Sequence, residues 1–232
     1  MILCGGDSFS KFNTPLGKYA DGDAPGLSAV ELLMKRFNTP GTSIGWAGAS
    51  IDATVAKAIH YITNHTDVKF LFFYLTVNVR IMYSLKINDS FRYADKGFDD
   101  PHFFNDTDIT SVHSPERVVN TTSYKYFMHH PTYKKYYDRY AYLNFLTNVC
   151  KNRGINILYI RTSESELDTN LFLDNTDNTR IIDLDLPSDM YTNSSKDLRK
   201  RLANHLFPYE QKAFSEKILN NHESFILESL QK

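Results

Sequence analysis

Four polar positions along the chain carry the residue types that acyl transfer requires. Ser8 follows a short apolar run and two glycines, Gly48 stands in a Gly-Ala-Ser turn, Asn78 follows the most apolar segment, and His205 precedes the last predicted helix. A serine hydroxyl can attack a carbonyl, a histidine can take up its proton, and amides can bind the resulting oxyanion. Each residue alone is more typical of a turn or a helix cap. Their combination at the ends of predicted strands favours a catalytic interpretation.

The elements that must position these residues alternate along the chain. Short apolar, β-prone segments predict strands, and segments with apolar residues at helical spacing predict helices. Strands are predicted at 2–4, 42–46, 70–76, 155–160 and 179–184, and helices at 27–37, 51–62, 131–154 and from 208 onward. This alternation predicts an α/β fold, a three-layer α/β/α sandwich around a five-stranded parallel sheet with right-handed crossovers.

In such a sheet the carboxyl ends of all strands share one edge, and ligands bind in the crevice there. Ser8 follows the first predicted strand, Gly48 the second and Asn78 the third. His205 stands at the entrance to the last helix. We therefore expect the four residues to gather at this edge.

With these blocks in this order, the chain resembles the SGNH hydrolases, the superfamily of GDSL-type esterases and lipases. The resemblance rests on Gly6-Asp7-Ser8-Phe9-Ser10, Gly48, Asn78 and His205, and it spans nearly the whole chain. It implies a flavodoxin-like sandwich in which Ser8 is the nucleophile and His205 the general base. It also implies an oxyanion hole made of the Ser8 amide, the Gly48 amide and the Asn78 side chain. The mechanism forms an acyl-enzyme and calls for no metal or organic cofactor.

One departure from the family pattern concerns the histidine. The family usually has Asp three residues before it, and Leu202 occupies that position here. His205 would need another orienting group, such as a backbone carbonyl, Asp185 or Asp197, or would work in a Ser-His dyad. The alternative is a catalytically impaired SGNH-fold module that binds a glycan or protein partner. A plain flavodoxin-like binding domain, a further alternative, predicts that Ser8 and His205 lie far apart.

The expected protein is a single domain over residues 1–232 that hydrolyses a carboxylic ester. The expected substrate carries a short acyl or acetyl group on a carbohydrate or another small molecule. Arg80 is a candidate contact for a substrate carboxylate or phosphate, although a structural ion pair is the more common role for an arginine just after a strand. Residues 84–130, polar and aromatic without a sustained period, predict an irregular insertion of the kind that forms lids or binding surfaces.

The composition of the chain indicates which kinds of partner and which cellular compartment to expect. A formal net charge of -1 over 232 residues gives no overall field that would attract a nucleic acid. No segment has the apolar length of a membrane span or the pattern of a signal peptide. Cys4 and Cys150 lie in apolar segments, which predicts two buried free thiols and a reducing environment. We therefore expect a soluble protein in the cytoplasm or another intracellular compartment.

The histidines of the irregular insertion do not predict a metal site. They lack the close ligand spacing typical of zinc centres, and they occur at positions 102, 113, 129 and 130. No glycine-rich phosphate loop followed by lysine is present, so the sequence gives no support for nucleotide hydrolysis.

Overall fold

The computed structural model describes residues 1–12, 26–45, 51–75, 132–162, 177–185 and 206–231. Strands and helices alternate through most of this part of the chain. In chain order they are β1 (Ile2–Gly5), the 3₁₀ turn η1 (Ser8–Ser10), α1 (Ala29–Arg36), β2 (Gly41–Ser43), α2 (Ile51–Asn64), β3 (Phe70–Leu75), α4 (Thr132–Asn152), β4 (Asn156–Thr162), β5 (Thr179–Leu184) and α6 (Pro208–Leu230).

The five strands form one parallel sheet in the order β2-β1-β3-β4-β5. Ile2 of β1 stands opposite Gly41 of β2 on one side and Phe70 of β3 on the other. The predicted α/β fold with a five-stranded parallel sheet is therefore confirmed. The strand order is the one typical of flavodoxin-like sheets, and it places β1 between β2 and β3.

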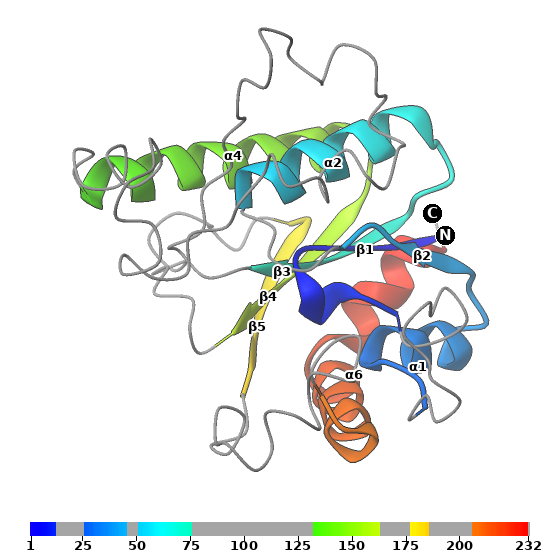
Figure 1. Cartoon of the computed structure of the whole chain (residues 1–232). Coiled ribbons are helices and arrows are strands. Elements are labelled where there is room, and N and C mark those ends of the chain that lie inside the picture. The colour runs from blue at the N-terminus through cyan, green and yellow to red at the C-terminus, as the bar shows by residue number, and fades with distance from the viewer. Residues whose placement is uncertain (13–25, 46–50, 76–131, 163–176, 186–205, 232) are drawn as a thin grey trace, which may run out of the picture.

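Both faces of the sheet are covered by helices within the described residues. Successive side chains of a strand point to opposite faces, so Ile2 and Cys4 pack toward α1 and α6 whereas Leu3 packs toward α2 and α4. Every residue of β3 is buried, as expected for a strand with helices on both sides. Figure 1 shows the resulting three layers, with α2 and α4 on one face and α1 and α6 on the other.

The beginning of α1 is fixed by a capping box and by α6. The Ser28 hydroxyl accepts the amide of Glu31 at 3.3 Å, and the Glu31 carboxylate accepts the amide of Ser28 at 2.8 Å. The side-chain oxygen of Gln211, in the first turn of α6, accepts the Ala29 amide at 2.7 Å. These bonds satisfy amides that have no partner inside the helix, and they join the beginnings of the two helices on this face.

The predicted elements are present, with shifts at their ends. The second strand is predicted over 42–46 but spans Gly41–Ser43; beyond it the Ile44 amide still donates to the Cys4 carbonyl at 2.9 Å, and Trp46 lies outside the described residues. The irregular insertion predicted at 84–130 lies outside the described residues, and the single-domain organisation stays a prediction. No helix in the described ranges is long and apolar enough to cross a membrane.

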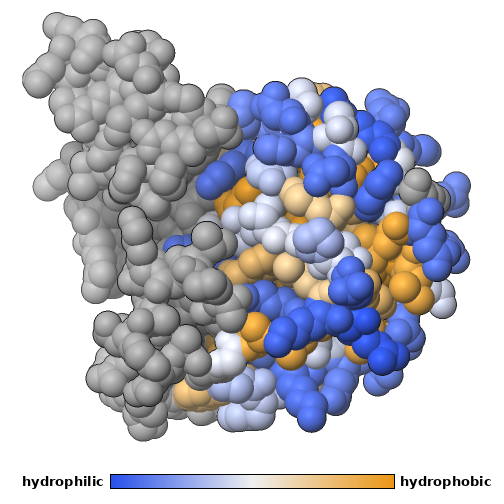
Figure 2. Space-filling model, turned by 90° about the vertical axis from the view of Figure 1, so that its right-hand side faces the viewer, coloured by the Kyte–Doolittle hydropathy of each residue, from blue (hydrophilic) through white to orange (hydrophobic). Residues whose placement is uncertain are grey.

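The surface of the described residues carries both hydrophobic and hydrophilic side chains. Figure 2 views the molecule from the side on which both termini lie in Figure 1, and hydrophobic residues there form small patches among hydrophilic ones. Large exposed hydrophobic side chains include Phe145 on α4 and Tyr209 on α6. Single exposed apolar residues of this kind are normal for folded proteins.

Both cysteines are buried free thiols, as predicted. Cys4 packs on the α1 and α6 face of the sheet, and Cys150 of α4 packs on the opposite face. Burial raises the pKa of each thiol above its usual value. The thiolate is the reactive form of cysteine, and the raised pKa keeps its fraction low. Burial also keeps reagents away from the sulfur atoms, so we expect both cysteines to be unreactive in the folded protein.

We predict that neither Cys4 nor Cys150 reacts with Ellman's reagent in the folded protein at mildly alkaline pH. Both cysteines should react once concentrated guanidinium chloride has unfolded the chain. Glutathione serves as the control that gives the reaction rate of an exposed thiol. A cysteine of the folded protein that reacts as fast as glutathione would contradict the burial described here.

Candidate active site

The turn that follows β1 is shaped by a close approach to β3. Gly6 has a φ of 131°, a conformation that side-chain-bearing residues rarely adopt. A Cβ atom at Gly6 would lie 2.5 Å from the carbonyl oxygen of Tyr74 and 2.7 Å from its Cβ. Only glycine therefore lets the chain turn here while it stays against β3.

Ser8 begins the one-turn helix η1 directly after this bend. On one side of it, Asp7 is only 2% exposed, and its Oδ1 accepts the amide of Phe9 at 3.1 Å. The Asp7 carbonyl accepts both the hydroxyl of Ser10 at 2.6 Å and the amide of Ser10 at 3.1 Å. The backbone of Ser8 is therefore held between two hydrogen-bonded neighbours at the carboxyl end of β1.

A second set of hydrogen bonds joins this turn to the chain that leaves β2. The Ser43 hydroxyl donates to the carbonyl oxygen of Ser10 at 2.8 Å and accepts the Gly45 amide at 3.3 Å. A Cβ atom at Gly45 would lie 1.7 Å from the Ser10 hydroxyl oxygen and 2.8 Å from the Asp7 carbonyl oxygen. The chain after β2 therefore packs directly against the turn after β1.

The entrance to α6 lies beside the beginning of α1. Leu206 is 2% exposed and belongs to the apolar cluster that also contains Phe9. A Cβ atom built on Gly26 would be 3.8 Å from the Cβ of Pro208, which is ordinary van der Waals contact. The Gln211 side chain adds its bond to Ala29. The side-chain nitrogen of Gln211 is buried and makes no hydrogen bond within the described residues.

A charged cluster stands at the carboxyl ends of β4 and β5. Arg161 forms a salt bridge with Asp183 at 2.5 Å, and the hydrogen bond between the two side chains is the main cause that lowers the pKa of Asp183. Lys217 of α6 donates to the Asp185 carboxylate at 2.7 Å and to the Asp183 carbonyl at 2.8 Å. Asp185, one of the groups considered as an orienter of His205, thus has Lys217 as a partner and an 83% exposed side chain.

A small cavity of about 190 Å³ lies between the end of β5 and the first turns of α6. Its apolar walls include Leu184, Leu206 and Phe214, and Asp185 and Lys217 contribute charged groups. Leu206, which lines this cavity, directly follows His205 in the chain.

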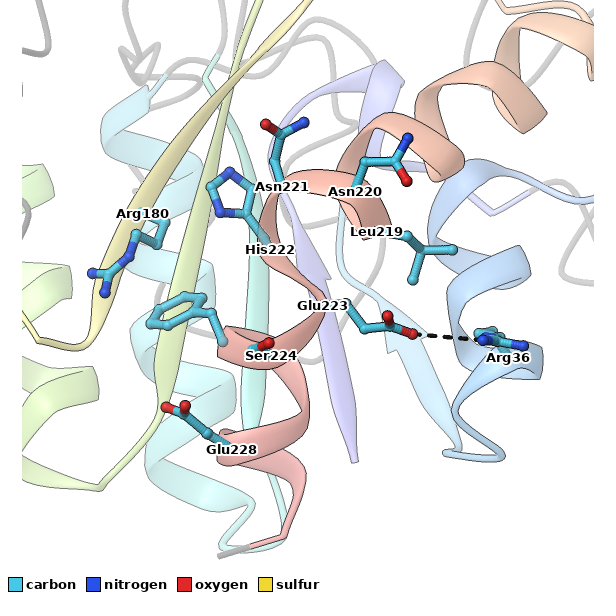
Figure 3. Close-up of a pocket in the computed structure, with 10 residues that line it drawn as sticks. Arg36, Arg180, Leu219, Asn220, Asn221, His222, Glu223, Ser224 and Glu228 are labelled. Carbon is cyan, nitrogen blue, oxygen red and sulfur yellow. Dashed lines mark ion pairs between the residues drawn. The ribbon is translucent and has the colours of Figure 1, made fainter.

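A larger polar cleft of about 680 Å³ surrounds the later turns of α6 (Figure 3). Figure 3 shows Glu223 pointing toward Arg36 of α1, with which it forms an ion pair at 3.7 Å. On the other side of the helix, the Arg180 guanidinium stacks 4.6 Å from the centre of the Phe225 ring. Arg180 is near the amino end of β5, so this cleft lies away from the edge where parallel sheets bind ligands.

The predicted site residues are only partly within the described structure. The backbone of Ser8 is described and lies where the sequence predicted it, at the carboxyl end of the first strand. The remaining features lie outside the described residues, namely the Ser8 side chain, Gly48, Asn78, Arg80, Asp197, Leu202 and His205. Their roles stay predictions.

Sequence reasoning did not identify the residues that hold the serine turn in place. Ser10, Ser43 and Gly45 make contacts between segments that are 33 or more residues apart, and their types are ordinary in turns. Gln211 carried no signal either, because a glutamine in a first helical turn is common. Among the described residues, no cluster of three or more His, Cys, Asp or Glu side chains could hold a metal ion.

These features define an α/β protein of flavodoxin-like strand order whose first strand ends in a tightly packed serine turn at the carboxyl edge of the sheet. Comparison with protein-family models gives no match for this chain, and comparison with curated proteins gives no significant match.

We predict that Gly6→Ala destabilises the fold by about 3 kcal/mol or more, because it combines an unfavourable φ with a backbone clash. The matched control is Gly154→Ala after α4, where φ is 68° and, apart from the chain neighbours, no atom of the described residues lies within 4 Å of the added Cβ. That substitution should cost only the conformational strain, about 1–2 kcal/mol. Urea unfolding followed by circular dichroism measures both, and equal losses would contradict the close packing of Gly6.

Proposed function

We propose that this protein is a serine ester hydrolase in which Ser8 is the nucleophile and His205 the general base. The observation that carries the proposal is the position of Ser8, in a glycine-dependent turn at the carboxyl end of β1. That strand lies inside the sheet, and both of its neighbours end at the same edge. Sheets of this kind bind their ligands in a crevice at the carboxyl edge, which is where a nucleophilic serine would act.

The strand order supports the proposed oxyanion hole. The two strands that flank β1 are β2 and β3. Gly48 follows Gly45 by three residues, and Asn78 follows Leu75, the end of β3, by three residues. The strands that precede the two proposed donors in the chain are thus the two strands that flank β1.

The packing of α6 supports the proposed base in the same way. His205 is bonded to Leu206, which is buried at the entrance to α6. The hydrogen bond from the Ala29 amide to the Gln211 side chain holds this entrance beside the beginning of α1. The segment that carries His205 therefore ends at an anchored point of the fold.

In the proposed reaction, the Ser8 hydroxyl attacks the ester carbonyl while His205 takes its proton. The amides of Ser8 and Gly48 and the Asn78 side chain stabilise the oxyanion. His205 then protonates the departing alcohol, and water hydrolyses the acyl-enzyme by the same steps. Arg80 is a candidate contact for an anionic part of the substrate.

We propose a short acyl group, such as acetyl, on a carbohydrate or another small molecule as the substrate. This substrate class is what the resemblance to the SGNH hydrolases implies. The two buried free thiols support a location in a reducing intracellular compartment.

We predict that the protein hydrolyses p-nitrophenyl acetate and that Ser8→Ala lowers kcat at least about a thousandfold, because the nucleophile is lost. The control is Ser215→Ala on α6, which removes a serine hydroxyl bonded to the Lys212 carbonyl at 2.8 Å. That variant should keep the activity of the wild type.

Activity that survives Ser8→Ala would exclude Ser8 as the nucleophile. A folded wild type without any esterase activity would contradict the proposal and would favour the impaired binding module.

A further inference from the structure

Strand β5 forms one edge of the sheet, and the hydrogen bonds of the ladder show which of its backbone groups point outward. The Ile157 amide donates to the Asn178 carbonyl at 2.8 Å, and Ile157 stands opposite Thr179. In a parallel ladder the N–H and C=O groups of one residue point to the same side, and that side alternates along the strand. Asn178 therefore faces β4, whereas the backbone groups of Thr179, Ile181 and Asp183 point away from the sheet.

Two side chains of α6 bond outward backbone groups of β5. The Lys217 ammonium donates to the Asp183 carbonyl at 2.8 Å. Burial of the His222 ring lowers its pKa, and a hydrogen bond with the Ile181 backbone partly offsets that effect. Figure 3 shows the His222 ring on the side of α6 that faces Arg180 of β5. Helix α6 thus covers one face of the sheet and also reaches over its edge.

The third outward carbonyl, that of Thr179, is bonded from within the strand. It accepts the Arg180 guanidinium at 2.8 Å. Helix α6 supports this side chain as well, because the guanidinium lies 4.6 Å from the centre of the Phe225 ring. All three outward groups are therefore bonded by basic side chains that α6 supplies or supports.

The spacing of the two elements makes this arrangement regular. Lys217 and His222 are five residues apart on α6, which corresponds to about 7.5 Å along a helix axis. Asp183 and Ile181 are two residues apart on β5, which corresponds to about 6.6 Å along a strand. Because the helix runs antiparallel to the strand, its two donors match two successive outward carbonyls.

An open strand edge can pair with a strand of another chain. A strand added to β5 would lie about 4.8 Å from it, in the space that Lys217 and His222 occupy, and it would need the carbonyls that they bond. The opposite edge of the sheet is limited in another way, since β2 has three residues and offers little to pair with. Strand β5 has six residues, so it is the edge that needs covering.

We propose that Lys217 and His222 close the edge of β5 against pairing with the same edge of a second copy of this chain. A two-fold axis would bring two β5 strands together antiparallel, so that the outward amides of each copy meet the outward carbonyls of the other. Every copy presents this strand at the concentration of the protein itself, which makes a second copy the partner to exclude. The inference is independent of the proposed ester hydrolysis.

The test compares the wild type with the double variant Lys217→Ala/His222→Ala by sedimentation velocity over a range of protein concentrations, with folding checked by circular dichroism. The variant should gain a concentration-dependent association that raises its mass toward that of a dimer, because two carbonyls of the edge are then free to pair. If the double variant does not fold, the two single variants replace it under the same criteria.

The matched control removes the same two residue types away from β5. In Lys212→Ala/His65→Ala, the lysine lost is one that pairs with Glu216 of its own helix at 4.0 Å. The histidine lost is one that stacks on Tyr61 with ring centres 4.0 Å apart. This control should sediment like the wild type at every concentration.

Amide hydrogen exchange followed by NMR locates the association. The amides of Ile181 and Asp183 point outward, so they would donate to the second copy. Their exchange should become slower in Lys217→Ala/His222→Ala at the concentrations at which it associates, and should not depend on concentration in the wild type.

A folded double variant that sediments like the wild type would overturn the inference. So would association of the control to the same extent, or association of the variant without slower exchange at Ile181 and Asp183, which would place the contact elsewhere. A wild type in which these two amides become protected as its concentration rises would show an open edge, and would also overturn it.

Discussion

The close approach of Gly6 to Tyr74 is the constraint on which the candidate site depends. Strands β1 and β3 are parallel neighbours in the sheet. At the end of β1 the chain must bend, whereas β3 continues through the buried Tyr74. A residue with a Cβ atom would strike the backbone of β3. Glycine at this one position lets the chain place Ser8 in the first turn after the strand. The following hydrogen bonds of Asp7 and Ser10 then keep the turn closed.

The sheet makes this turn a suitable place for chemistry. Burial of Ile2, Leu3 and Cys4 fixes the register of β1 between its neighbours, because alternate side chains must enter opposite cores. The end of β2 is then joined to the serine turn by Ser43 and Ser10, and α6 is joined to α1 by Gln211. The backbone of Ser8 is thus supported from both sides by segments that the sheet brings together.

Much of this fold can be predicted from the sequence because its signals are local. The apolar segment Phe70–Leu75 is nearly continuous, which is typical of a strand buried on both faces. Ser28 and Glu31 have the spacing of a capping box, and Gly154 has the positive φ typical of a glycine that ends a helix. The placement of Ser8 after the first strand also follows from local pattern.

The remainder depends on contacts between distant segments. Apolar residues at 44 and 46 extend the predicted second strand, whereas the observed strand ends at Ser43 and Gly45 packs against Ser10 of the turn after β1. The strand order follows from how the crossovers pack, which no single segment specifies. The bond between Ser43 and Ser10 links positions 33 residues apart, and both are ordinary turn residues in the sequence.

The central claim is that the fold activates Ser8, and covalent labelling with a fluorophosphonate followed by peptide mass spectrometry tests it most directly. The account predicts one adduct, on the peptide that contains Ser8, which is formed by the folded protein and lost on unfolding. The absence of an adduct, or an adduct on another serine, would contradict it.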